Sequence, residues 1–181
     1  MASVFTHAFV AVAMGKVYAG GRMPARFWVL SAACAVLPDA DVLGFAFGVR
    51  YGDTFGHRGF SHSITFALML AVAVVAVFFR EERRRRAALV VYFFLVTISH
   101  ALLDMLTDGG LGVGLLSPFS NERYFFPFRP VEVSPIGIRQ FFGEWGLAVI
   151  VSELLWVWLP AALVALVVLI LRRARGRARK V

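Results

Sequence analysis

Long, nearly unbroken runs of apolar residues dominate the chain, and charged residues gather between the runs. A transmembrane helix needs about 20 apolar residues, and three runs are long enough: 61–79, 87–106 and 146–171, the last of which contains Pro160. Two shorter apolar stretches, 4–19 and 27–37, predict shorter or more tilted helices. The pattern predicts an all-α integral membrane protein. We expect about five transmembrane or membrane-embedded helices and a long outer loop over residues 107–145.

Composition agrees with this interpretation. The chain has 181 residues, of which 60% are hydrophobic and 17% charged, and its mean hydropathy is +0.76. Soluble domains are roughly 45–50% apolar and about 25% charged, and one small soluble core could not bury so much apolar surface. The single cysteine, Cys34, excludes an intramolecular disulfide and a zinc site built on several cysteines. A cleaved signal peptide is the alternative for the first stretch, but that stretch lacks a basic N-terminal region.

Basic residues form three clusters between the apolar runs. The clusters are Lys16, Arg22 and Arg26; Arg80 and Arg83 to Arg86; and Arg172, Arg173, Arg175, Arg177, Arg179 and Lys180. The positive-inside rule places all three in the cytoplasm, so residues 42–60 and 107–145 are expected outside. We expect one membrane-embedded catalytic domain over 1–171 and a basic cytoplasmic tail over 172–181. A short basic tail after a final span favours a topology signal or anionic-lipid contact, and no nucleic-acid partner is expected.

The histidines and several aspartates fall at the helix ends opposite the basic clusters. They are His7, His57, His62 and His100, with Asp39, Asp41 and Asp104 at the same depth. His100 and Asp104 form an i, i+4 pair, which puts both side chains on one helical face. Each residue alone is more typical of a hydrogen-bonded core group or a salt bridge. Their convergence indicates a metal site, because imidazole with carboxylate suits zinc or a similar divalent ion.

Two segments frame these groups. Pro38 is expected to break the second helix, which leaves Asp39 and Asp41 on a loop that offers one ligand and one base. In the segment 57–63, Ser61 is expected to cap the following helix. Arg58, beside two histidines, suits an anionic substrate.

The outer loop contains an aromatic segment, residues 115–128. It predicts either an interfacial lid, since aromatic rings favour the headgroup region, or a segment packed on the helices. Arg123 and Arg129 could assist substrate binding or be ordinary loop arginines. Glu153, inside the last span, could be a late ligand or substrate contact, or could hydrogen-bond a neighbouring helix.

Four segments in order resemble the motifs of a known family. They are Thr6-His7, Leu37 to Asp41, Gly56 to Ser63 and Ser99 to Thr107, within roughly the first 110 residues. These motifs are similar to those of the inner-membrane metal-dependent hydrolase family, which is YdjM-like and often called LexA-regulated. That family is distantly similar to the zinc-dependent phospholipase C and nuclease superfamily, which binds clustered zinc with His and Asp. The superfamily uses more than one H-x-x-x-D element and this chain has one, so one or two ions are expected.

The resemblance implies Asp41, His62, His100 and Asp104 as core metal ligands, with His7 and His57 as further ligands or outer contacts. It implies zinc, with manganese or magnesium as alternatives, in a bacterial-type inner membrane. We expect metal-activated water to cleave a phosphoester of a membrane lipid at the periplasmic side. In that hypothesis Asp39 is the general base or orients a ligand histidine, and Arg58 holds the phosphate. Two rival hypotheses are a transporter or ion pathway and a metal-stabilised scaffold without turnover. The oligomeric state is left open.

Overall fold

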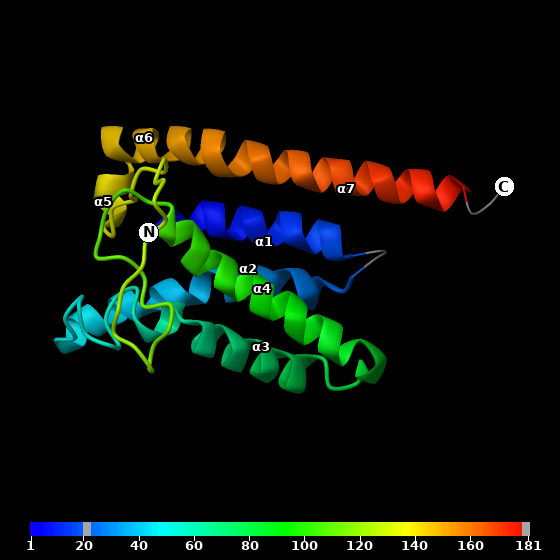
Figure 1. Cartoon of the computed structure of the whole chain (residues 1–181), viewed down its shortest axis with the longest axis horizontal. Coiled ribbons are helices and arrows are strands. Elements are labelled where there is room, and N and C mark those ends of the chain that lie inside the picture. The colour runs from blue at the N-terminus through cyan, green and yellow to red at the C-terminus, as the bar shows by residue number, and fades with distance from the viewer. Residues whose placement is uncertain (20–22, 179–181) are drawn as a thin grey trace.

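Helices dominate the protein in the computed structural model, which describes residues 1–19 and 23–178 (Figure 1). The long helices are α1 (Val4–Tyr18), α2 (Ala25–Val36), α3 (Ile64–Phe78), α4 (Arg86–Met105), α6 (Glu144–Glu153) and α7 (Leu159–Ala178). Shorter elements are the 3₁₀ helices η1 (Leu37–Phe47), η2 (Phe60–His62) and η3 (Arg83–Arg85), α5 (Ile138–Phe141), and a π-helical turn, η4 (Leu154–Trp158). Within the described residues there is no β-strand, only two isolated bridges. The predicted all-α membrane fold is confirmed.

Three continuous helical runs are long and apolar enough to cross a membrane: Ala25–Phe47, Arg83–Met105 and Glu144–Arg175. The helices α1 and α3 are apolar but shorter, with 15 residues each. The expected span over residues 61–79 is therefore too long. The helix begins only after Ser63, whose hydroxyl accepts a hydrogen bond from Phe66 N at 3.0 Å, so the prediction that Ser61 is the cap was wrong.

The second helix also differs from expectation. The α-helix ends at Val36 as predicted, but the chain does not enter a loop there. It tightens into η1 and stays helical to Phe47, where Gly48 ends it with a φ of 80°. Proline is tolerated in the first turn of a helix because those N–H groups lack an intrahelical partner anyway. Asp39 and Asp41 consequently lie on a fixed helical frame.

The helix α4 lies at the centre and packs against α1, α2 and α3. Buried side chains from these helices form the main apolar core, including Phe27, Val75, Leu89 and Phe93. Figure 1 places the α1–α2 connection, the α3–α4 connection and the end of α7 at one end of the bundle. The three basic clusters therefore share an end, although Arg22, Arg179 and Lys180 lie outside the described residues. The helix α7 runs through Arg172 without a break.

The outer loop covers the opposite end and packs on the helices. Phe126 N donates to Met105 O at 3.0 Å, and Ile64 N donates to Leu115 O at 3.0 Å. Leu115, Tyr124 and Phe126 pack on a small core between α3 and α4. Only parts of the 115–128 segment point outward, such as Phe119, which is 85% exposed. Of the two interpretations of this segment, the structure supports packing on the bundle.

Candidate metal centre

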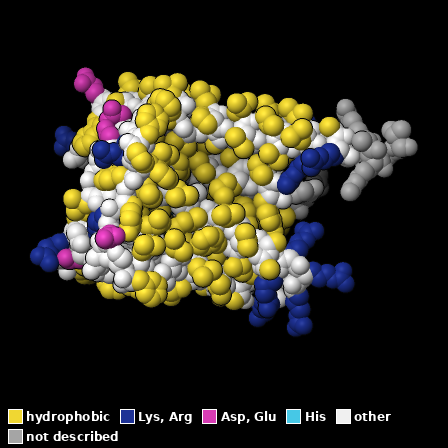
Figure 2. Space-filling view, in the orientation of Figure 1, with side chains coloured by type: hydrophobic (Ala, Val, Ile, Leu, Met, Phe, Trp, Pro, Cys, Tyr) yellow, Lys and Arg dark blue, Asp and Glu magenta, His cyan; other side chains and the backbone are white. Residues whose placement is uncertain are grey.

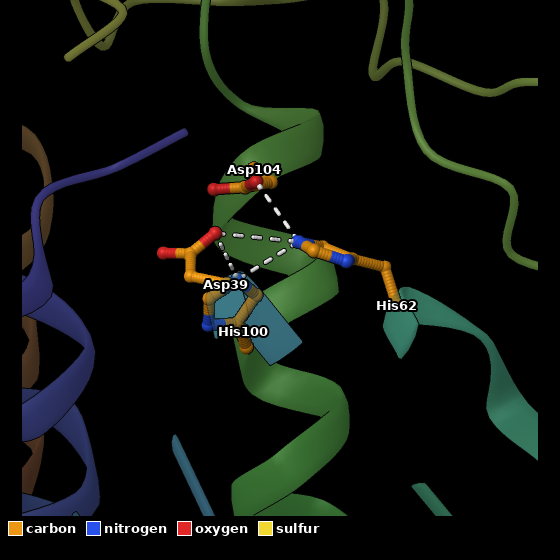
Figure 3. Close-up of side chains that lie close together, drawn as sticks. All are labelled: Asp39, His62, His100 and Asp104. Carbon is orange, nitrogen blue, oxygen red and sulfur yellow. Dashed lines mark hydrogen bonds and ion pairs between the residues drawn. The ribbon is translucent and has the colours of Figure 1, made fainter. Parts of the chain in front are cut away.

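Four side chains from three elements converge at the loop end of α4 (Figure 3). Asp39 comes from η1, His62 from η2, and His100 and Asp104 from successive turns of α4. One nitrogen or oxygen atom of each lies within 4.8 Å of the others, and all four residues are buried. The i, i+4 spacing in α4 and the 3₁₀ frame around Asp39 aim these groups at one point.

The spacing of the donor atoms fits a small tetrahedral ion. His62 Nε2 lies 3.0 Å from His100 Nε2, and Asp39 Oδ1 lies 3.3 Å from His100 Nε2. Asp39 Oδ1 and Asp104 Oδ2 are each 3.6 Å from His62 Nε2. Two ligands about 2.0–2.1 Å from a tetrahedral zinc ion are roughly 3.4 Å apart. In the described part of the chain, neither oxygen of Asp39 accepts a hydrogen bond, so this buried carboxylate is left for a cation.

The other ring nitrogen of His100 is held by the backbone. Its Nδ1 donates to Ala35 O at 2.7 Å, which fixes the proton on Nδ1 and leaves the Nε2 lone pair for the centre. The Ala35 carbonyl can accept this bond because Pro38, three residues later in a 3₁₀ register, has no N–H to donate. A ligand histidine in metal sites typically donates its other N–H to a carbonyl or carboxylate in this way.

Asp41 orients two imidazoles at once. Its Oδ1 lies 2.7 Å from His57 Nδ1, and its Oδ2 lies 3.3 Å from His62 Nδ1. The same Oδ2 accepts from Ser61 Oγ at 2.6 Å and from Arg58 N at 3.1 Å. Asp41, His57 and His62 form a second group that could hold an ion, but the Asp41 oxygens already have several donors. The sequence indicated Asp41 as a core ligand, whereas the structure brings Asp39 into the four-residue set.

Arg58 is completely buried and ion-paired. Its Nε lies 3.0 Å from Asp104 Oδ2, and its other nitrogens donate to Gly109 O and Thr107 Oγ1, both at 2.9 Å. Its backbone has a φ of 61°, a conformation that non-glycine residues rarely adopt and that recurs at functional sites. These contacts occupy the guanidinium with Asp104 and its neighbours. Arg58 therefore positions Asp104, whereas its expected contact with a phosphate stays a prediction.

The glycines beside Arg58 are required by the tight backbone. A Cβ at Gly56 would lie 2.1 Å from Arg50 O, and one at Gly59 would lie 2.2 Å from Thr54 O. No side chain fits at either distance. The loop that carries His57 and Arg58 can therefore close only with glycine at these positions.

The charges of the centre favour a divalent cation. The three carboxylates of Asp39, Asp41 and Asp104 face the guanidinium of Arg58 and the buried N-terminal ammonium, so with neutral imidazoles one negative charge is uncompensated. Burial alone lowers the pKa of the His62 imidazole, but the carboxylates of Asp104, Asp39 and Asp41 outweigh burial and raise that pKa to about 10. The centre thus draws positive charge strongly, and buried charges of this kind are normally paired or bound to metal.

His7 and Glu153 lie next to this centre but differ in role. The His7 ring stacks on His100 with centroids 3.7 Å apart, and its Nε2 is 3.6 Å from Asp104 Oδ1. Both His7 nitrogens are buried without a hydrogen bond among the described residues, so His7 is available as a further ligand. Glu153 is buried at the start of α1, where it accepts hydrogen bonds from Ser3 N, Ser3 Oγ and Thr6 Oγ1. Of the two hypotheses for Glu153, the structure supports the hydrogen bond to a neighbouring helix.

The two outer-loop arginines lie away from the four-residue set. Arg123 donates to the carbonyls of Tyr51, Asp53, His57 and Gly112 and so fastens the loop around His57. Arg129 lies over the Phe125 ring at 4.7 Å and is exposed. Both fit the ordinary loop interpretation rather than substrate contact.

A cavity of about 380 Å³ reaches His57 from the outer surface. Its wall includes Tyr51, His57, Gly110, Gln140 and Trp145. Since His57 Nδ1 faces Asp41, Nε2 is the nitrogen left for a ligand in this cavity. The His57 and His62 rings are 5.6 Å apart, so the cavity ends close to the metal ligands. The 133–145 segment, which the sequence did not single out, therefore forms the entrance.

Several contacts of the centre could not be predicted from residue types, because backbone groups make them. The Ala35 carbonyl and the Ala2 N–H, which donates to Asp104 Oδ1 at 2.7 Å, are backbone groups. Thr107 did carry a signal, since it follows Asp104 by three residues within the last quoted motif. The link from Ser61 to Asp41 and His62 was missed because Ser61 was interpreted as a cap.

Comparison with known proteins gives one family and one named relative. The family model described as "YdjM inner membrane protein" matches residues 1–178. The chain is 43% identical over 163 residues to the inner membrane protein YbcI of Escherichia coli K12. The aligned region covers 90% of this chain and 94% of that protein. No solved structure matches the chain. Neither name specifies an activity or a metal.

Proposed function

The chain belongs to the YdjM inner membrane protein family, and from that premise we propose that it is a membrane-bound metal-dependent hydrolase. It cleaves a phosphoester of a phospholipid or another lipid-linked phosphate. The observation that carries the proposal is the buried convergence of Asp39, His62, His100 and Asp104 within 4.8 Å. A structural ion would need only such a closed set, but here a cavity with an imidazole in its wall adjoins the set.

Asp39, His62, His100 and Asp104 hold the ion, and zinc fits this mixture of nitrogen and oxygen donors best. Manganese or magnesium is the alternative, and a second ion would add Asp41 and His57. The chemistry that such an ion supplies is acidification of water and polarisation of a phosphoryl oxygen. Arg58 keeps Asp104 in place through the buried ion pair, and Asp41 keeps the His62 ring in its tautomer.

His57 is the residue best placed to move a proton. Asp41 Oδ1 fixes its Nδ1 at 2.7 Å, so the ring presents Nε2 to the cavity. A carboxylate-backed imidazole is a usual general acid or base near neutral pH. This assignment exchanges the roles expected from the sequence: Asp39 becomes a ligand, and His57 with Asp41 becomes the proton-transfer pair.

The surroundings of the cavity favour an amphiphilic substrate. A second pocket of about 240 Å³, lined by Phe5, Ile136, Phe141 and Phe142 among others, lies across the segment 134–137 from the His57 cavity. A substrate with an apolar chain next to a phosphoryl group would fit these two adjacent pockets. We place the centre on the periplasmic side, because the basic clusters share the opposite end of the bundle.

The test is turnover by the detergent-purified protein. Wild type, His57→Gln and Asp53→Asn are loaded with zinc and incubated with mixed phospholipids, and the products are identified by mass spectrometry. We expect a metal-dependent phosphate-containing product from wild type and from Asp53→Asn, an exposed-loop control. His57→Gln should retain metal and lose about 10²–10⁴-fold in rate. Bound metal without product from any lipid would contradict the proposal and favour a transporter or a scaffold.

A further inference from the structure

A long groove runs along the bundle between α4 and α7, with α1 as its floor. Figure 2 shows it as a hollow lined with apolar side chains. Its volume is about 950 Å³. It exists because α7 packs against α1 and diverges from the central helix. Val91 and Leu95 form the α4 wall, Val164 lies on the α7 wall, and Ala13 lies on the floor.

The groove has the length of a membrane interior. Its α4 wall extends from Ala88 to Leu106, a separation of 18 residue steps that spans roughly 27 Å at about 1.5 Å per step. The hydrocarbon core of a bilayer is about 30 Å thick. The groove is therefore open to the acyl-chain region over most of its length.

The groove is separate from the metal centre. Buried Leu103, Val131 and Val157 pack together at its loop end, with Ala2 behind them. This apolar cluster closes the path toward Asp104. A ligand of the groove would therefore not reach the metal ligands, and what binds there does not depend on the proposed hydrolase activity.

The opposite end of the groove carries a positive charge. Arg172 lines it there together with Tyr18 and Ala88. The neighbouring helix ends add Lys16, Arg83 to Arg86 and Arg173, which outnumber Glu81 and Glu82 of the α3–α4 connection. Among the described residues, the groove wall contains no acidic side chain. A second copy of the chain would insert in the same orientation and bring the same basic end against Arg172, which like charges oppose. A phosphate with apolar chains complements both the charge and the walls.

We propose that the α4–α7 groove binds an anionic phospholipid, with its phosphate on Arg172 and an acyl chain between α4 and α7. Arginine suits this role because its planar donors pair with two phosphate oxygens. The lipid fills the space that α7 leaves beside the central helix and couples α7 to it.

The test is native mass spectrometry of delipidated protein titrated with phosphatidylglycerol or phosphatidylcholine of the same chain length. Two matched pairs of variants are compared. Arg172→Gln removes the groove charge, and Arg173→Gln removes the next charge, which does not line the groove. Val164→Trp fills the groove, and Leu163→Trp places the same side chain at the neighbouring exposed position outside it.

Wild type should retain phosphatidylglycerol in preference to phosphatidylcholine. Arg172→Gln should weaken phosphatidylglycerol binding about fivefold, the effect of one arginine near a lipid phosphate, and Arg173→Gln should not. Val164→Trp should abolish retention of both lipids, with a thermal midpoint at least equal to that of Leu163→Trp. Equal binding of the two lipids in all variants would overturn the proposal. So would a dimer that Val164→Trp alone dissociates.

Discussion

The central helix α4 and the α6–α7 run are both long enough to cross a membrane, but they are used in opposite ways. In the most apolar window of each, 56% of the α4 run is buried against only 11% of the α6–α7 run. The helix α4 is enclosed by α1, α2 and α3 and carries His100 and Asp104 inside the protein. The helix α7 turns most of its apolar side chains outward.

This difference teaches how the chain can keep charges at membrane depth. An ionisable group facing lipid is costly, whereas one inside a bundle can be paired or bound to a cation. The protein therefore concentrates its aspartates and histidines around the enclosed helix. In its apolar part, residues 146–171, the peripheral run carries one ionisable group, Glu153, and buries it completely against the start of α1.

The largest effect on this contrast should come from Arg58→Met. The change removes the guanidinium beside Asp104 Oδ2, so this buried carboxylate loses its arginine ion pair. We expect a loss of about 3–5 kcal/mol in the free energy of unfolding. Arg50→Met, which removes an 87% exposed arginine from a surface pair with Asp53, should cost less than about 1 kcal/mol. Denaturation in detergent measures both, and similar costs would show that Arg58 is not a buried ion-pair residue.

Two leucine-to-alanine substitutions compare the stability contributed by the enclosed helix with that of the peripheral helix. Leu89→Ala opens a cavity in the core around α4, since Leu89 is only 2% exposed, and should cost about 2–4 kcal/mol. Leu163→Ala shortens a side chain on α7 that is 62% exposed, and should cost less than about 0.5 kcal/mol. The same denaturation experiment provides the comparison. Equal losses would mean that α7 is covered by protein in the membrane.

The smallest effect is expected from Glu153, the buried carboxylate on the peripheral run. Glu153→Gln keeps the shape but can put an NH₂ donor in place of Oε2, the oxygen that accepts from both Ser3 Oγ and Thr6 Oγ1. We expect a loss of about 1–3 kcal/mol, because the hydroxyls lose an acceptor inside the protein. Glu144→Gln, at an exposed position on the same helix, is the control and should be neutral. A neutral Glu153→Gln would show that this link does not hold α1.

The sequence predicts the membrane class and the gathering of the site well, for identifiable reasons. Apolar runs report burial in lipid directly, and the basic clusters fix which helix ends lie together. From these alone His62, His100 and Asp104 fall at one end, and the structure brings them within 4.8 Å together with Asp39.

What the sequence could not supply depends on backbone geometry. The continuation of the second helix beyond Pro38 depends on a 3₁₀ register that single-residue preferences do not reveal. That register also explains why Asp39, and not Asp41, joins His62, His100 and Asp104, since residues two apart point in different directions. Arg58 also looked free in the sequence, because the Asp104 that pairs with it is 46 positions away and meets it only in the folded chain.

The most direct test of the metal centre is elemental analysis of detergent-purified wild type, Asp39→Asn and Asp53→Asn after reconstitution with zinc. Asp39→Asn removes one ligand charge from the buried set, and Asp53→Asn makes the same change on the surface. We predict about one or two zinc ions per chain in wild type and in Asp53→Asn, and a clear loss in Asp39→Asn. Wild-type protein that binds no divalent ion, or Asp39→Asn protein that binds as much as wild type, would contradict the metal centre described above.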